Sequence, residues 1–129
     1  MSMTTRISTA PDAPAPAASY AQALEVTGAT RTLFISGQVP VTVDGEVPEG
    51  FAAQGAVVWA NIEAQLRAAD MTFDNLVKCT VFLADRRYAL DNRAAREAAL
   101  GDRRISMTVV IAGIFDAGWL LEIEAIAMA

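Results

Sequence analysis

The clearest pattern in the chain is a run of apolar positions three and four residues apart, between Phe51 and Ala69. This spacing places the apolar side chains on one face of an α-helix. Gln54, Asn61, Gln65 and Arg67 lie off that face. A second helix is predicted from Arg86 to Leu100, because this stretch is rich in Ala and charged residues and holds no Gly or Pro.

Strand patterns occupy much of the remaining chain. They cover Ala21 to Val26, Thr32 to Ser36, Leu76 to Ala84, Ser106 to Phe115 and Trp119 to Met128. The first two flank a turn signal, Thr27-Gly28, and predict a hairpin. Segment 106–115 is almost uniformly apolar, which is typical of a strand covered on both faces. The resulting order, β-β-α-β-α-β-β, predicts an α+β sandwich of two helices against a mixed sheet.

Two helices can cover only one face of such a sheet, so the other face needs a partner. The chain is 53% apolar and 19% charged, which is more apolar and less charged than is usual. We therefore expect another copy of the chain to cover the bare face. Residues 8–18, STAPDAPAPAA, predict an extended or mobile leader, because Pro lacks the donor that helices and sheets need. We divide the chain into an Ala/Pro-rich N-terminal segment, residues 1–18, and one domain, residues 19–129.

Composition excludes several classes of function. The net charge of −5 argues against nucleic-acid binding, which needs clustered positive charge. The absence of histidine excludes catalytic triads and His-ligated zinc, and no metal-ligand spacing or phosphate loop occurs, so no metal or cofactor is expected. A single cysteine cannot form an internal disulfide, which favours a reducing cytoplasm. No apolar run reaches the roughly 18 residues of a membrane span, and residues 1–18 lack the apolar core of a secretory signal.

Glu122 is the most unusual residue by context. A carboxylate in an apolar strand costs on the order of several kcal/mol if it is buried and unpaired. Either Glu122 and Glu124 face water on an edge strand, or Glu122 is held near a cleft to move a proton or orient water. Cys79 follows the core side of its strand and is interpreted as a packing residue. The pair Arg103-Arg104 is either an exposed loop or a binder of carboxylate or phosphate.

Three further polar residues each have a structural and a ligand-binding interpretation. Tyr20 either packs at a sheet edge or donates a hydrogen bond to a ligand. Ser36 either caps a turn or donates to a ligand oxygen, and it is not an activated nucleophile because no histidine base exists. Asn92 is either a solvated helix residue or a ligand contact. None of these signals is specific alone.

Taken in chain order, five segments form a specific set: SYAQAL at 19–24, LFISGQVPV at 33–41, DGEVPEG at 44–50, LVKCTVFLAD at 76–85 and EIEAIA at 122–127. Together they resemble the Rid family of reactive-intermediate (enamine/imine) deaminases, also called YjgF-type or endoribonuclease L-PSP proteins. This resemblance implies a chorismate-mutase-like α+β sandwich, with two helices on one face of a mixed six-stranded sheet. It also implies a homotrimer with three ligand clefts between neighbouring subunits.

The resemblance assigns roles to particular residues. In the deaminases an arginine binds the substrate carboxylate, and a glutamate near the C-terminus positions water to attack the imine carbon. By motif the glutamate falls on Glu122, while Tyr20, Ser36 and Asn92 contribute to the cleft. The arginine position, fifteen residues before the glutamate, falls on Met107. A thioether offers neither charge nor hydrogen-bond donors, so carboxylate binding is expected to be weakened.

Two hypotheses about function therefore stay open. In the first, the protein hydrolytically deaminates a small imine or enamine, with Glu122 positioning water and an altered anchor for the substrate. In the second it is a non-catalytic, trimeric metabolite-binding or regulatory protein, because Met107 replaces the arginine. Both imply a small-molecule ligand and neither nucleic acid nor membrane as partner. Arg103 or Arg104 reaching in from a neighbouring subunit is another source of positive charge.

Overall fold

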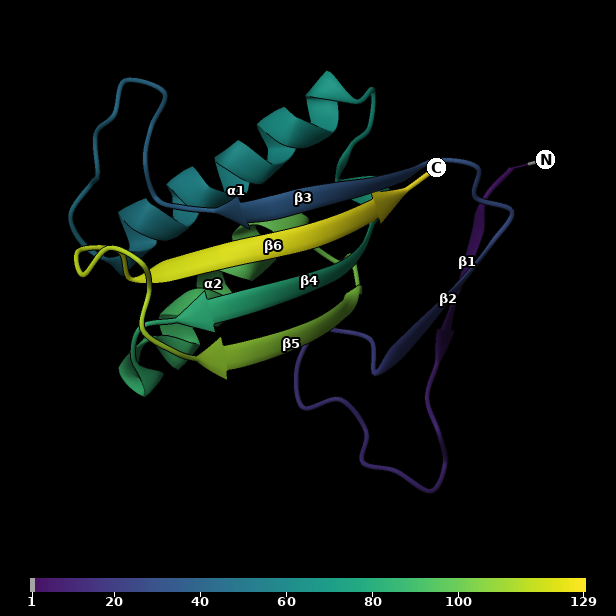
Figure 1. Ribbon diagram of the computed structural model, residues 1–129. Helices are drawn as coiled ribbons and strands as arrows, with labels where there is room; N and C mark the ends of the chain where they lie inside the picture. The colour runs from purple at the N-terminus through teal and green to yellow at the C-terminus, as the bar shows by residue number, and fades with distance from the viewer. Residues whose placement is uncertain (1) are drawn as a thin grey trace.

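The computed structural model describes residues 2–129, and its centre is a four-stranded sheet with two helices against one face (Figure 1). The sheet is formed by β3 (Thr32–Gln38), β4 (Leu76–Leu83), β5 (Ser106–Ile111) and β6 (Leu121–Met128), and the helices are α1 (Phe51–Ala68) and α2 (Ala89–Leu100). The strand order is β3-β6-β4-β5. Strands β4 and β5 run parallel and the other pairs antiparallel, so the sheet is mixed. The predicted α+β sandwich is confirmed.

A second, two-stranded sheet stands away from the first (Figure 1). It pairs β1 (Thr4–Ser8) with β2 (Ala23–Thr27), so the six strands are divided two and four. The expected hairpin between the segments at 21–26 and 32–36 is therefore wrong. Strand β2 pairs with β1, helped by an exposed ion pair of 3.3 Å between Arg6 and Glu25. Strand β3 pairs with β6 instead, which buries Ile35 in the core. The division of the chain at residue 18 stays a prediction.

Helix α1 follows the predicted apolar stripe, but two polar residues that lie off this stripe also turn inward. Asn61 is half-buried, and its Nδ2 donates to the carbonyls of Val39 (3.1 Å) and Val41 (3.0 Å). Gln54 is buried. Its amide is fully used, because Nε2 donates to the carbonyls of Pro48 (3.0 Å) and Gly118 (3.1 Å) and Oε1 accepts from the Leu120 N–H (2.8 Å). A polar side chain is stable in this interior position because every strong donor and acceptor finds a partner.

Two single-turn 3-10 helices join the main elements. The first, η1 (Phe73–Asn75), precedes β4, and the second, η2 (Arg86–Tyr88), precedes α2. The predicted helical stretch from Arg86 to Leu100 is thus helical throughout, but its first turn is the tighter 3-10 form. Neither α-helix of the described residues combines the length and apolar character needed to cross a membrane.

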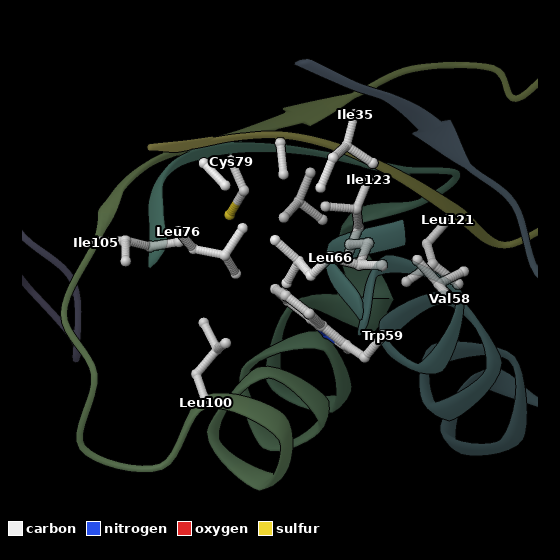
Figure 2. Close-up of a cluster of buried hydrophobic side chains, with 14 of the residues drawn as sticks. Ile35, Val58, Trp59, Leu66, Leu76, Cys79, Leu100, Ile105, Leu121 and Ile123 are labelled. Carbon is white, nitrogen blue, oxygen red and sulfur yellow. The ribbon is translucent and has the colours of Figure 1, made fainter. Parts of the chain in front are cut away.

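The core lies between the helices and the sheet (Figure 2). Leu66 and Trp59 come from α1, while Cys79 and Ile123 come from β4 and β6. Strand β4 alternates as predicted, with its odd-numbered positions from Val77 to Leu83 buried. This alternation leaves the even-numbered residues of the central strands on the face opposite the helices.

That second face is open, as expected from the prediction that two helices can cover only one face of the sheet. Phe34 on β3 is 75% exposed. Strand β5 differs from expectation, because it ends at Ile111 and its residues 108–111 are exposed rather than covered on both faces. The reason is its place at the sheet edge, where it has β4 as its only full-length neighbour in the described chain. Its apolar character is that of a surface which a single chain leaves uncovered.

Candidate functional site

Three of the candidate ligand-binding residues line one cavity of about 380 Å³ beside α2 and β5. Tyr20 reaches it from the segment before β2, Asn92 from α2 and Met107 from β5. The remaining walls are formed largely by small or apolar side chains, together with one glutamine and two arginines: Ala17, Ala18, Gln22, Leu83, Ala89, Arg93, Arg96 and Val109. The cavity thus combines an apolar lining with a few polar groups, as small-molecule sites do.

Backbone pairing positions two of these side chains. The Ala21 N–H donates to the Ile105 carbonyl at 2.9 Å, which holds Tyr20 beside the start of β5. Met107 lies opposite Cys79 in the parallel β4–β5 ladder, and Cys79 faces the helices. Since opposed residues of a ladder share a face, Met107 points to the helix side.

Ser36 and Glu122 lie elsewhere in the single chain. Ser36 is exposed on the open face, at a bulge in the β3–β6 pairing, where it lines a second cavity, of about 440 Å³, with Lys78 and Thr80. Glu122 is half-buried, and its side chain lies directly over Gly37. A Cβ atom at position 37 would overlap the carboxylate and lie 2.7 Å from the Glu122 Cδ. Glycine therefore provides the space that the Glu122 carboxylate occupies.

The segment leading into Glu122 is fixed from α1. Gln54 binds the backbone of Gly118 and Leu120, the residues just before β6. These buried amide bonds set where the strand begins, and with it the position of Glu122. Hydropathy spacing does not indicate this role, because it places Gln54 off the apolar face of the helix.

Arg96 is a site residue that the sequence pattern did not reveal. Its side chain is 5% exposed and lines the cavity beside Asn92 and Met107. One guanidinium nitrogen, Nη1, donates to the Met107 Sδ at 3.6 Å, a weak acceptor. The other, Nη2, is enclosed and has no hydrogen-bond partner within residues 2–129, and the same is true of the Asn92 Oδ1. The spacing of four between Asn92 and Arg96, continued at the buried Leu100, is the sequence signal of this inward face.

The other basic and nucleophilic candidates do not reach the cavity. Arg103 donates to Asp74 Oδ1 at 2.7 Å and to the Leu100 carbonyl at 3.1 Å. Neither Arg103 nor Arg104 lines the cavity in the described part of the chain. Burial raises the pKa of the Cys79 thiol to about 12, although the nearby charge of Arg96 lowers it. Cys79 is therefore a protonated packing residue at neutral pH.

No cluster of three His, Cys, Asp or Glu side chains that could hold a metal ion occurs among residues 2–129. The chemistry that the arrangement offers comes from one carboxylate over a glycine and from a cavity with a buried guanidinium.

The fold defines the class of protein. A solved structure of a conserved Rid-family protein of unknown function, YyfB from Yersinia pestis, superimposes with a TM-score of 0.81 at 25% identity, covering 97% of this chain and 98% of that one. The family model described as endoribonuclease L-PSP matches residues 10–129. The chain belongs to this family, which is the Rid/YjgF family.

Two curated relatives extend the comparison. Protein HMF1 of Saccharomyces cerevisiae is 34% identical over 116 residues, covering 89% of this chain and 88% of the yeast protein. A bovine protein named 2-iminobutanoate/2-iminopropanoate deaminase is 44% identical over 81 residues, covering 61% of this chain and 56% of the bovine one. The family and fold predicted from the sequence are confirmed.

Proposed function

We propose that this protein binds a small metabolite in clefts between the subunits of a homotrimer. Tyr20, Asn92 and Met107 form one wall of the cleft, and Ser36 and Glu122 of a neighbouring copy form the other. The separation of these two groups in a single chain supports this arrangement, as does the exposed apolar face of the sheet. Light scattering on the purified protein tests it, and a monomer at micromolar concentration would contradict it.

The reaction we propose for this cleft is hydrolytic deamination of a small imine or enamine. The Glu122 carboxylate accepts a proton from a water molecule as the water oxygen bonds to the imine carbon. That proton passes to the nitrogen and gives a carbinolamine. The hydroxyl proton of the carbinolamine then also passes to the nitrogen as the carbon–nitrogen bond breaks, so the products are a carbonyl compound and ammonia; an enamine first tautomerises to the imine. A positioned general base of this kind contributes roughly 100- to 10,000-fold to a rate.

The observation that carries this proposal is the carboxylate of Glu122 held over Gly37, with no side chain at position 37 to displace it. The name of the bovine relative supports the same chemistry, although the match covers 56% of that protein. The buried Asn92 Oδ1, which has no partner in the described residues, supports a ligand that carries a hydrogen-bond donor.

The experiment is a competition with semicarbazide. Small imines such as 2-iminobutanoate are generated in situ, and the protein is expected to suppress semicarbazone formation, followed by absorbance. Glu122→Gln should lose this effect, whereas Glu124→Gln, on the same strand and face, should keep it. Equal activity in the wild type and Glu122→Gln would contradict the assigned role.

A second function is favoured by one residue. Met107 stands where the deaminases carry the arginine that binds the substrate carboxylate, and a cleft without that arginine suits binding alone, as in a metabolite sensor or regulator. Wild-type protein that binds a small ligand but leaves semicarbazone formation unchanged would support this alternative.

We place the protein in a reducing compartment, with the cytoplasm as the first choice. The single cysteine is buried and reduced, so no disulfide contributes to the fold. Retention of the melting temperature in millimolar dithiothreitol would agree with this proposal.

A further inference from the structure

A buried arginine without a carboxylate partner is the feature of this molecule that most needs an explanation. Arg96 is 5% exposed, and of its two terminal nitrogens one donates only to the Met107 sulfur. The other has no partner within the described residues. A buried guanidinium is costly unless an anion and further hydrogen bonds compensate it, and a thioether supplies neither.

The surroundings of Arg96 point to a ligand as the missing partner. The side chain lines the cavity of about 380 Å³, and Asn92, one helical turn earlier on α2, lines the same cavity. The Asn92 Oδ1 also lacks a partner among residues 2–129. Two buried residues with unpartnered polar atoms, one helical turn apart, thus line one mostly apolar cavity, which is the pattern of groups that fix a ligand's orientation.

We propose that Arg96 binds the carboxylate of a small organic acid in this cavity. The cation expected on strand β5 at position 107 is supplied from helix α2 instead, where one guanidinium nitrogen of Arg96 contacts the Met107 sulfur. This inference rests on the proposed function, in that the same cavity is the ligand site. It adds the residue that selects the ligand, because Arg96 favours ligands that carry a carboxylate.

A single monocarboxylate fits the geometry better than a phosphate does. The planar guanidinium matches the two oxygens of a carboxylate. A phosphate dianion needs more donors, and the only other arginine lining the cavity, within the described chain, is the exposed Arg93. The net charge of −5 disfavours anions at long range, so a local buried cation is what an anionic ligand requires here.

The test compares 2-oxobutanoate with 2-oxobutanamide, which differ in charge but little in shape, by isothermal titration calorimetry. Wild-type protein is expected to bind the acid at least about 10-fold more tightly than the amide. Arg96→Gln and Arg96→Met should weaken binding of the acid about 30-fold or more and remove the preference, while Arg96→Lys should retain part of it. Arg86→Gln, an exposed arginine outside the cavity, is the control with the same loss of charge.

Three binding results would overturn the inference. The first is equal affinity of the wild type for acid and amide, and the second is unchanged affinity of Arg96→Gln for the acid. The third is competition by inorganic phosphate at the same concentration, which would indicate a general anion site. Arg96→Met guards against misfolding, because it replaces the guanidinium by an apolar group, and its melting curve and oligomeric state are measured alongside. If ligand-free Arg96→Met falls apart into monomers, Arg96 is an interface residue and the inference is wrong.

Failure of this inference is distinguishable from failure of the proposed function. Acid binding that depends on Arg96, without any effect on semicarbazone formation, would support the anion site and contradict catalysis. Turnover of 2-iminobutanoate with a KM that Arg96→Gln does not change would support catalysis and contradict the anion site.

Discussion

Adding a single methyl group at Gly37 tests the role of Glu122 without altering its charge. In Gly37→Ala the new Cβ would overlap the carboxylate and lie 2.7 Å from Cδ and 3.0 Å from Cγ of Glu122. Carbon atoms in ordinary contact are about 3.5–4.0 Å apart, so the carboxyl carbon must retreat by about 1 Å. A displacement of about 1 Å from the productive geometry costs on the order of 100-fold in rate. We therefore expect kcat/KM for imine hydrolysis to fall about 100-fold.

The same substitution should leave the fold intact. Gly37 is not among the glycines with positive φ, so its backbone conformation accepts alanine. Lower entropy of the unfolded chain favours Gly37→Ala by about 0.4–1 kcal/mol. A strained Glu122 rotamer opposes it by about 0.5–1.5 kcal/mol. These contributions nearly cancel. Since a change of 1 kcal/mol shifts the melting temperature of a small domain by about 4–8 °C, the melting temperature of Gly37→Ala is expected to stay within a few degrees of wild type.

The assay is the semicarbazide competition, with circular dichroism for stability. Gly113→Ala is the matched control, because a Cβ there meets nothing within 4 Å. In a Glu122→Gln background, Gly37→Ala should add little further loss, since both changes act on one group. A folded Gly37→Ala protein with wild-type activity would refute the reasoning.

Three further predictions concern stability. Burial raises the pKa of Cys79 from the ordinary thiol value of 9.0 to about 12, so the unfolded chain loses this proton at lower pH than the folded one. The free energy of unfolding should therefore fall between pH 9 and 12 by up to about 1.4 kcal/mol per pH unit. Measured by urea unfolding at several pH values, this fall with pH should be smaller in Cys79→Ala, and an equal fall would contradict the burial effect. Leu66→Ala removes a fully buried side chain and should cost about 2–5 kcal/mol in urea unfolding; a loss below about 1 kcal/mol would contradict the core assignment. Gln54→Ala breaks three buried hydrogen bonds and should destabilise by about 2–4 kcal/mol, whereas the exposed Gln65→Ala should be near neutral; equal effects would show that the amide contacts contribute nothing.

Elements with a strong local period were predictable from the sequence. Helix α1 and strand β4 each bury one face. Apolar residues spaced three and four apart therefore indicate the helix, and apolar residues spaced two apart indicate the strand. The open face of the sheet was also predictable, because two helices cannot cover both sides. The family resemblance grouped Tyr20, Ser36, Asn92, Met107 and Glu122 in one cleft; Tyr20, Asn92 and Met107 line one cavity of the single chain, and the ligand-binding roles of all five stay predictions.

Other features were not predictable because they depend on contacts between distant residues. Strand β1 has almost no apolar side chain, so no hydropathy pattern predicts it. It forms by pairing with Ala23–Thr27. Gln54 and Arg96 are polar residues at inward positions, where a hydropathy pattern counts them as solvated. Gln54 is stabilised by particular backbone partners and Arg96 lies beside a cavity, and a hydropathy pattern along the sequence does not indicate either.

The exposed edge of β5 bears on how readily single chains of this protein aggregate. An edge strand with unpaired N–H and C=O groups is a template for other chains, and natural proteins usually protect it with lysine, proline or a covering segment. In β5, Val109, Val110 and Ile111 are exposed, and no lysine or proline interrupts them. Among residues 2–129, the only backbone pairing on this edge is the bridge between Ala21 and Ser106 at the start of the strand. In the proposed homotrimer, chains that dissociate in mild denaturant should therefore aggregate through this edge, and the preparation should precipitate sooner. Newly made chains would face the same hazard before the proposed trimer assembles.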